Sequence, residues 1–233
     1  MTKESVLITG SGRGLGRNLA LVFAENGHDL VLNGRDESKL KRVLEEISPT
    51  RVNTSYVVGD IREIETINKL EEEAKRNNIS ILINNAGSPT GGTLFEELTY
   101  EEVIETITTN LISPIELMRR IYPLLQEKDG GTIININSII GLECKELKGI
   151  GCAARWGLRG FTGSLRLEAD KYGIDVISVY PSKIKTKQEY TFGFEPRDVA
   201  ERIYKKHAEG FSGMLTLDGR PEEFKPKRDI EYG

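Results

Sequence analysis

The sequence has little of what marks a metal-binding, disulfide-linked or triad-type catalytic protein. Only two cysteines and two histidines occur among its 233 residues. Cys144 and Cys152 show no metal-type spacing and no histidine nearby, so we expect reduced thiols, no disulfide framework and no metal site. His28 and His207 join no catalytic triad or ligand set, and we expect both on the surface.

Long apolar runs and an excess of positive charge are missing as well. No apolar run approaches the ~20 residues that a membrane span requires, and the first residues hold no apolar signal-peptide segment. The formal net charge is -4, whereas a nucleic-acid-binding protein is expected to be basic. We therefore expect a cytoplasmic protein that binds neither membrane nor nucleic acid.

Short apolar runs, typical of buried strands, alternate along the chain with amphipathic segments, typical of helices. Repeated alternation without a change in composition predicts an α/β fold, a single-domain doubly wound parallel sheet (Rossmann fold), over residues 1–233 with a tail at 220–233. The predicted strands are 5–9, 29–33, 53–58, 79–84, 131–138, 175–180 and an edge strand at 214–217. The predicted helices are 15–26, 37–47, 64–77, 100–126 with a kink near Pro114, 153–172 and 196–207.

A glycine-rich turn joins the first predicted strand to the first predicted helix. Glycines let the backbone turn sharply and approach a pyrophosphate, and the helix N-terminus offers unpaired N–H groups and the positive end of its dipole. Because a strand precedes this turn and a helix follows it, the segment predicts a dinucleotide site. Its residues are Gly10, Ser11, Gly12, Arg13, Gly14, Leu15 and Gly16.

The end of the second predicted strand distinguishes between the two nicotinamide dinucleotides. A carboxylate there accepts hydrogen bonds from a free 2′-hydroxyl, whereas a guanidinium suits a 2′-phosphate. This strand is followed by Arg35, while Asp36 comes one position late and Arg13 can supply a second positive group. The sequence therefore favours NADP(H), with NAD(H) as the alternative.

Further motifs follow the glycine turn in order along the chain. The turn itself has the pattern T-G-x-x-x-G-x-G, and an N-N-A-G run follows the fourth predicted strand. With these motifs the chain resembles the short-chain dehydrogenase/reductase family over nearly its whole length, from Ser5 to about Leu217. The matching positions are Thr9, Gly10, Gly14, Gly16, Asn84, Asn85, Ala86, Gly87, Asn110, Ser138 and Pro181.

The resemblance implies roles for residues outside the glycine turn. It implies that Ser138 orients the substrate, and that Asn110 kinks the long helix and holds a proton-relay water. It also implies that the adenine, the ribose and the nicotinamide carboxamide contact residues after the third, fourth and sixth strands. These implied cofactor-binding residues are Asp60, Ile61, Asn85, Ala86, Gly87, Pro181, Ile184 and Thr186.

The chain departs from the family at the Y-x-x-x-K pair, where it has Gly151 and Arg155. In the family the tyrosine hydroxyl transfers the proton, and the lysine lowers its pKa and binds the ribose. Glycine offers no acid or base, and arginine keeps its charge near neutral pH. We expect Arg155 to preserve the cofactor contact and to form the candidate catalytic set with Ser138 and Asn110.

Three explanations of Gly151 stay open. It is an introduced substitution that disables an enzyme, or another group or water carries the proton, or the protein binds a dinucleotide without catalysis. Candidate substitute acids are Lys183, Tyr190 and Glu143, each of which has an ordinary structural role as well. We favour an NADP(H)-dependent oxidoreductase acting on a small-molecule carbonyl or alcohol over a catalytically silent NADP(H)-binding sensor or partner subunit.

The resemblance also implies association into a homodimer or homotetramer. Family members commonly pair their two long helices, here about 100–126 and 153–172, into a four-helix bundle. Apolar residues on these helices serve either that interface or the core of the chain itself. They are Leu111, Ile115, Met118, Phe161 and Leu165.

Overall fold

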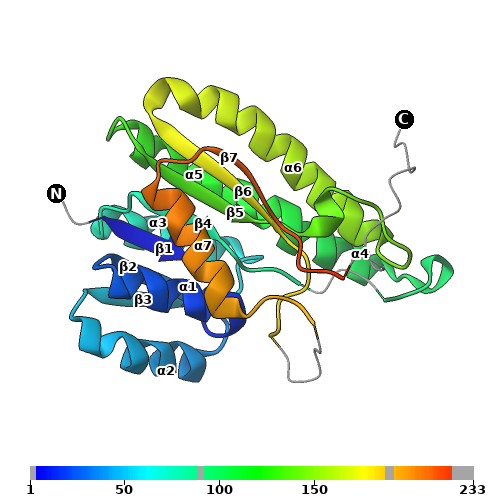
Figure 1. The fold of residues 1–233 in the computed structure, drawn as a ribbon, viewed down its shortest axis with the longest axis horizontal. Helices are drawn as coiled ribbons and strands as arrows, with labels where there is room; N and C mark the ends of the chain where they lie inside the picture. The colour runs from blue at the N-terminus through cyan, green and yellow to red at the C-terminus, as the bar shows by residue number, and fades with distance from the viewer. Residues whose placement is uncertain (1–3, 89–91, 187–191, 222–233) are drawn as a thin grey trace.

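The computed structural model describes residues 4–88, 92–186 and 192–221 (Figure 1). Seven strands form one sheet in the order β3-β2-β1-β4-β5-β6-β7, and every neighbouring pair is parallel. The doubly wound α/β fold is therefore confirmed, with the last strand at an edge. The strands are β1 (Ser5–Ile8), β2 (Asp29–Gly34), β3 (Thr54–Val58), β4 (Ile81–Asn84), β5 (Gly131–Ile136), β6 (Ile174–Pro181) and β7 (Gly213–Leu217).

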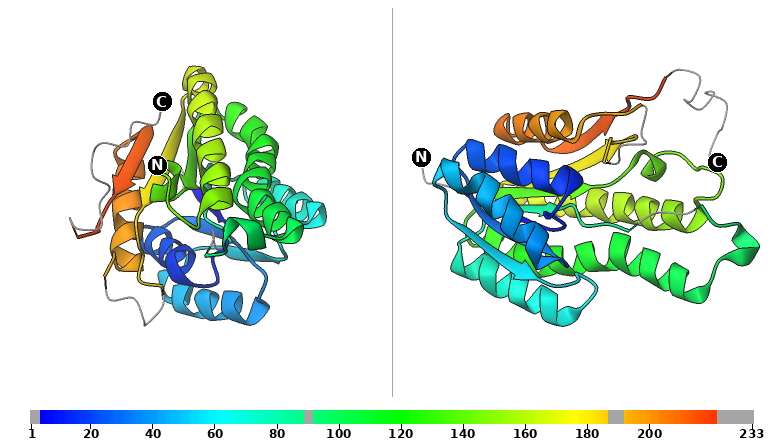
Figure 2. Two further views of the ribbon diagram at one scale, coloured as in Figure 1. Left: turned by 90° about the vertical axis from the view of Figure 1, so that its right-hand side faces the viewer. Right: turned by 90° about the horizontal axis from the view of Figure 1, so that it is seen from below.

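Helices cover both faces of the sheet (Figure 2). Successive side chains of a strand point to opposite faces, so in β1 Val6 and Ile8 belong to one apolar cluster and Leu7 to the other. The first cluster packs beneath α1 (Gly14–Glu25), α2 (Glu37–Ile47) and α7 (Pro196–Ala208). The second packs beneath α3 (Ile64–Arg76), α5 (Ser113–Gln126) and α6 (Gly149–Ala169).

The long helix predicted at 100–126 is distorted in its middle. A π-helical turn, Thr108–Ile112, separates α4 (Tyr100–Ile107) from α5. Pro114 has no N–H, so it cannot donate to the carbonyl four residues earlier, that of Asn110. The helix is therefore irregular just before Pro114, where the sequence predicts a kink, because the turn on the N-terminal side of the proline loses a hydrogen bond.

Helix α6 begins earlier than expected. It starts at Gly149 rather than at residue 153, and a 3₁₀ turn, Asp170–Tyr172, follows its end. Gly151 is buried within its first turn. The two glycines and the isoleucine at 149–151 are poor helix formers, which explains why the sequence pattern missed this turn.

The expectation that both histidines lie on the surface is wrong. His28 is 9% exposed, and the His207 side chain is 9% exposed. Helix α7 packs on α1, and the rings of Phe23 and Tyr204 lie against both imidazoles, with ring centroids 5.3–6.2 Å apart across these contacts. A sequence pattern lacks this contact because the two helices are far apart along the chain.

The described residues bear on two expectations, the absence of disulfides and the absence of a membrane-spanning helix. Cys144 is exposed and Cys152 is buried, and no disulfide bond joins these two described residues. Within the ranges that the structure describes, no helix is both long and apolar enough to cross a membrane.

Candidate functional site

The predicted site residues meet at one edge of the sheet. All strands are parallel, so their carboxyl ends share an edge, and the loops that follow them converge there. The glycine turn follows β1, and each later strand contributes a residue or short segment. These are Arg35 after β2, Asp60 after β3, Asn85 after β4, Ser138 after β5 and Ile184 after β6.

The glycine turn is a backbone cradle that side chains would fill. Gly10 has φ +64° and Gly14 has φ +56°, both in the left-handed region that favours glycine. A Cβ at Gly16 would lie 2.2 Å from the carbonyl oxygen of Gly10, and one at Gly10 would lie 2.9 Å from Cα of Ala86. The turn therefore leaves its backbone N–H groups and the start of α1 accessible to an anionic group such as a pyrophosphate.

Hydrogen bonds fix this turn to the end of β4. The Thr9 hydroxyl accepts the backbone N–H groups of Asn85 and Ala86, each at 3.0 Å. The Asn85 side chain donates to the carbonyl oxygens of Thr9 (2.9 Å) and Gly10 (3.1 Å). Two segments that the sequence predicts as cofactor-binding thus hold each other in position, and Asn85 supports the turn directly.

Arg35 is the more exposed of two arginines beside Asp60. The Arg35 side chain is 68% exposed, and its Nη1 lies 3.5 Å from Asp60 Oδ2. Arg62 holds Asp60 more tightly, through Nε at 3.1 Å and Nη2 at 2.8 Å, and these bonds lower the pKa of Asp60. The guanidinium of Arg35 is therefore held loosely next to the expected adenine site, where Ile61 is buried.

Asp36 caps helix α2 instead of facing the cradle. Its carboxylate accepts the backbone N–H of Lys39 at 3.2 Å and the hydroxyl of Ser38 at 2.7 Å. The Lys39 ammonium lies 2.5 Å away, and this bond contributes most to a pKa of Asp36 well below its usual range. Lys39 also lies beside the glycine turn, since its Cβ is 3.2 Å from a Cβ built on Gly12. Lys39 was not predicted from the sequence as a site residue, although its place in the first turn of α2, directly after β2, could have indicated it.

Asn110 is fully used in holding its surroundings. It is 1% exposed, and its Nδ2 donates to Ser88 Oγ at 2.9 Å and to the carbonyl oxygen of Thr106 at 3.0 Å. Its Oδ1 accepts the backbone N–H of Ser88 at 3.2 Å and Arg155 Nη2 at 2.9 Å. The π-helical turn therefore aims Asn110 at Arg155, and Ser88 is a member of this group that the sequence reasoning missed.

Arg155 is a buried cation. It is 8% exposed, its Nη1 donates to the carbonyl oxygen of Ile136 at 2.9 Å, and its Nε has no hydrogen-bond partner. Burial lowers the pKa of Arg155 to about 10, so it stays charged near neutral pH. Among the described residues no carboxylate forms an ion pair with it, and Gly87 approaches Nη2 so closely that an added Cβ would lie 3.0 Å away. A buried charge with an unused donor favours an electronegative partner.

Ser138 follows β5, and Gly151 lies on α6, the helix that also carries Arg155. The backbone N–H of Ser138 donates to Asn137 Oδ1 at 2.9 Å, and Asn137 Nδ2 donates to the Arg155 carbonyl oxygen at 3.0 Å. Asn137, which is buried and which the sequence reasoning missed, thus joins the end of β5 to α6. Gly151 lies four residues before Arg155 and therefore on the same face of α6.

The candidate substitute acids differ in their surroundings. Arg220 binds both carboxylate oxygens of Glu143, one of them at 3.0 Å, and Arg220 is anchored by Asp218 as well. Glu143 therefore fixes the C-terminal segment, and Arg220, at the start of the predicted tail, is held rather than free. Lys183 Nζ lies 4.6 Å from the ring centroid of Phe192. Tyr190 lies outside the described residues, as does the predicted tail from residue 222.

The segment expected beside the nicotinamide reaches the glycine turn. Pro181 ends β6 and pairs with Leu217 of β7, and the backbone N–H of Thr186 donates to the Ile184 carbonyl oxygen at 2.8 Å. The Thr186 methyl group would lie 3.1 Å from a Cβ at Gly14. The fold therefore brings Thr186 against the turn after β1, as a shared cofactor site requires.

A shallow groove of about 220 Å³ runs between α5 and α6. Met118 and Leu165 line it and are also buried in the core of the chain. Ile115 and Phe161 line it and are partly buried, while Leu111 packs against Gly157. The apolar residues predicted on these helices thus serve the core first, and the groove lies on the side expected for association.

Comparisons with known proteins support the family resemblance that the sequence motifs indicate. A family model described as short chain dehydrogenase matches residues 4–192. "Dehydrogenase/reductase SDR family member 7B" of Xenopus laevis is 31% identical over 190 residues, 78% of this chain and 58% of that protein. An uncharacterized oxidoreductase of Thermotoga maritima is 31% identical over 183 residues, 78% of this chain and 72% of that protein. The chain spans less than two thirds of the length of the Xenopus relative.

Solved structures share the fold. The alcohol dehydrogenase from the archaeon Thermococcus sibiricus, complexed with 5-hydroxy-NADP, is similar with a TM-score of 0.87. The match covers 94% of this chain and 99% of that chain at 21% sequence identity. At this identity the likeness concerns the fold alone.

Proposed function

The chain belongs to the short-chain dehydrogenase family, and from this premise we propose that it is an NADP(H)-dependent oxidoreductase that interconverts a carbonyl and an alcohol without the family's tyrosine. The observation that carries the proposal is the glycine cradle after β1, which the contacts of Asn85 and Thr186 complete. The fold alone does not require a turn from which side chains are excluded, whereas close approach of a pyrophosphate to the backbone does.

The preference for NADP(H) rests on the charges beside the cradle. Arg13, Arg35 and Lys39 place positive charge near the end of β2, and Arg35 is exposed there. Asp36, the carboxylate that follows Arg35 in the sequence, is occupied as a helix cap. A guanidinium suits a phosphate better than a hydroxyl.

Residues on the other side of the site bind and orient the reacting groups. Arg155 occupies the position of the family's ribose-binding lysine, and its charge is retained near neutral pH. When bound, NADP(H) supplies or accepts the hydride. The Ser138 hydroxyl orients the substrate oxygen, and water carries the proton because Gly151 has no side chain. A positioned acid is worth about 10²–10⁴-fold in rate, so the proposed enzyme is slow by that factor.

The test is a fluorescence titration of the purified chain with NADPH beside NADH, followed by product analysis with a panel of ketones and aldehydes. We expect saturable binding that prefers NADPH by about tenfold or more, as a charged hydrogen bond provides, and slow alcohol formation. Absence of binding by either dinucleotide would contradict the proposal. Binding without product across the panel would favour the second candidate.

That second candidate is a silent NADP(H)-binding protein that acts as a sensor or a partner subunit. One observation favours this candidate. Two N–H groups of Arg155 donate within the protein, to Asn110 and to the carbonyl oxygen of Ile136, so they are not available to a substrate or cofactor. Product formation by the unmodified chain would exclude it.

We also propose that residues 1–233 form one domain and that two chains associate through α5 and α6. The groove between these helices has an apolar floor and a charged rim of Arg119 and Glu168, typical of an interface between like chains. Light scattering coupled to gel filtration gives the mass, and Phe161→Glu is expected to convert the assembly to monomers.

A further inference from the structure

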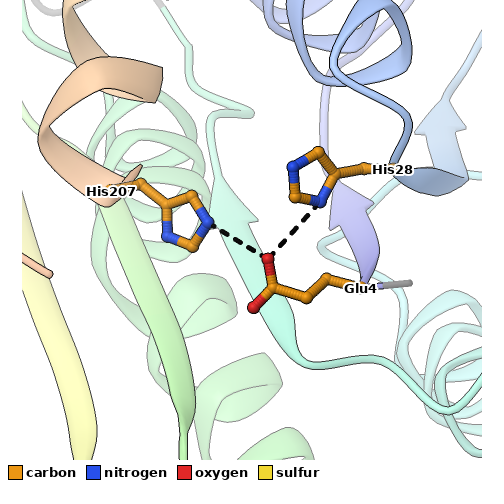
Figure 3. A group of neighbouring side chains, drawn as sticks. All are labelled: Glu4, His28 and His207. Carbon is orange, nitrogen blue, oxygen red and sulfur yellow. Dashed lines mark ion pairs between the residues drawn. The ribbon is translucent and has the colours of Figure 1, made fainter. Parts of the chain in front are cut away.

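A second cluster of chemically active side chains lies at the opposite edge of the sheet from the dinucleotide site. Glu4 precedes β1, His28 precedes β2 and His207 is in the last turn of α7 (Figure 3). One ligand atom from each lies within 4.8 Å of the other two. The proposed oxidoreductase activity uses none of these residues.

From this geometry we propose that Glu4, His28 and His207 bind a zinc ion, with water completing the coordination. Figure 3 shows both imidazoles pointing at the same carboxylate oxygen, Glu4 Oε2. His28 Nδ1 lies 3.6 Å from it and His207 Nε2 lies 3.5 Å from it. Tetrahedral zinc with bonds of about 2.0–2.1 Å places its ligand atoms roughly 3.3–3.4 Å apart. Small side-chain shifts therefore suffice to place an ion between the three groups.

A second observation points to a ligand. His28 is 9% exposed, and its Nδ1, which faces the cluster, has no hydrogen-bond partner. A buried ring nitrogen without a partner costs free energy unless a proton donor or a metal ion binds it.

The surroundings orient the donors in the way metal sites require. His207 Nδ1 lies 3.1 Å from Thr132 Oγ1, so Nδ1–H can donate to the hydroxyl while Nε2 faces the ion. Phe23 packs against both imidazole rings and restricts their rotation. Phe23, near the carboxyl end of α1, contacts His207 in the last turn of α7, and the partial negative charges of these helix ends favour a cation. The Glu4 side chain is 43% exposed, which leaves an entry path.

Two imidazoles and one carboxylate are ligands that Zn²⁺ prefers, whereas Mg²⁺ prefers oxygen ligands alone. The bound ion would join β1, β2 and the last helix, three segments far apart in sequence. A ligand that binds only the folded state stabilises it, so the proposed role of the ion is to fasten α7 to the start of the sheet.

The experiment uses the untagged chain, stripped with a chelator, so that its only imidazoles are His28 and His207. Zinc binding is measured by competition with a chromophoric chelator, and Mg²⁺ serves as the hard-cation control. We expect one Zn²⁺ per chain and a higher thermal unfolding midpoint with Zn²⁺ but not with Mg²⁺. No stoichiometric zinc binding by the folded wild-type chain would overturn the proposal.

Variants separate this site from the thiols. Glu4→Gln, at an exposed position, and His207→Gln should each weaken zinc binding by more than about tenfold, and Thr132→Val by about tenfold through the lost orientation of His207. Cys144→Ser is the matched control and should bind zinc as the wild type does. Zinc binding that survives Glu4→Gln and His207→Gln but is lost in Cys144→Ser would assign the ion to the cysteines and reject the site. Circular dichroism of each apo variant confirms that it is folded.

Discussion

The glycine turn after β1 and the first turn of α6 lie at the same edge of the sheet but are built differently. In the glycine turn the groups proposed to bind phosphate belong to the backbone, and Gly10 and Gly16 make approaches that leave no room for a Cβ. In α6 the functional groups are side chains, where Gly151 offers none and Arg155 is turned toward Asn110 and Ile136.

The difference shows which kind of function depends on single side chains. A backbone cradle is specified by the fold and by several glycines together, so binding of a dinucleotide persists as long as the turn does. Proton transfer by a side chain depends on one acid at one position, so the replacement of that one residue is enough to remove it. A site of this kind can therefore keep dinucleotide binding while its proton-transfer group changes.

The largest expected change in rate comes from introducing a tyrosine hydroxyl into α6 at position 151. Gly151→Tyr combined with Arg155→Lys should raise the rate of carbonyl reduction by about 10²–10⁴-fold, the value of a positioned proton donor. The measurement is NADPH oxidation under saturating cofactor. Gly151→Phe with Arg155→Lys is the matched control without a hydroxyl and should show no gain. Equal rates in the two folded double variants would show that α6 does not carry proton transfer.

The next effect tests the cradle itself. Gly16→Ala places a Cβ 2.2 Å from the Gly10 carbonyl oxygen, and we expect a loss of about 3 kcal/mol in unfolding free energy together with lost NADPH binding. Denaturant unfolding and the fluorescence titration measure both. Gly160→Ala, in exposed helix with nothing within 4 Å of an added Cβ, should be neutral or stabilising by up to about 1 kcal/mol. Full NADPH affinity in Gly16→Ala would contradict the proposal that the glycine turn binds the cofactor.

A smaller effect concerns the choice of dinucleotide. Arg35→Asp should weaken NADPH binding by about 10- to 100-fold, as expected for a lost charged hydrogen bond, and should narrow or reverse the preference over NADH. Arg76→Asp makes the same charge change at the far end of α3 and should leave both affinities unchanged. If both variants weaken NADPH equally, the effect is overall charge and not a specific contact.

The smallest effect separates a helix cap from a cofactor ligand. Asp36→Ala removes the acceptor of the Lys39 N–H, and we expect a modest fall in the thermal unfolding midpoint with the NADPH preference retained. Asp36→Ser keeps a capping oxygen and should restore the midpoint. A shift of preference between the dinucleotides in either variant would place Asp36 at the ribose instead.

Several features of this protein could be predicted from local sequence. Alternating strand and helix patterns predict the parallel sheet, and the glycine spacing after β1 predicts the phosphate cradle, because both depend on neighbours along the chain. The start of α6 was not predictable, since Gly149 and Gly151 weaken the helical pattern. Tertiary contacts hold the helix close by, where Asn137, after β5, donates to the Arg155 carbonyl oxygen.

Side-chain partners were set by the tertiary structure. The sequence by itself determined the order of the elements, the turn that excludes side chains and the absence of a hydroxyl at Gly151. Only the folded chain decided that Asp36 caps a helix, that Arg155 is buried against Asn110 and that His28 meets His207 and Glu4. The physical reason is that backbone preferences act over a few residues, whereas burial and hydrogen bonding join groups that the chain brings together only when it folds.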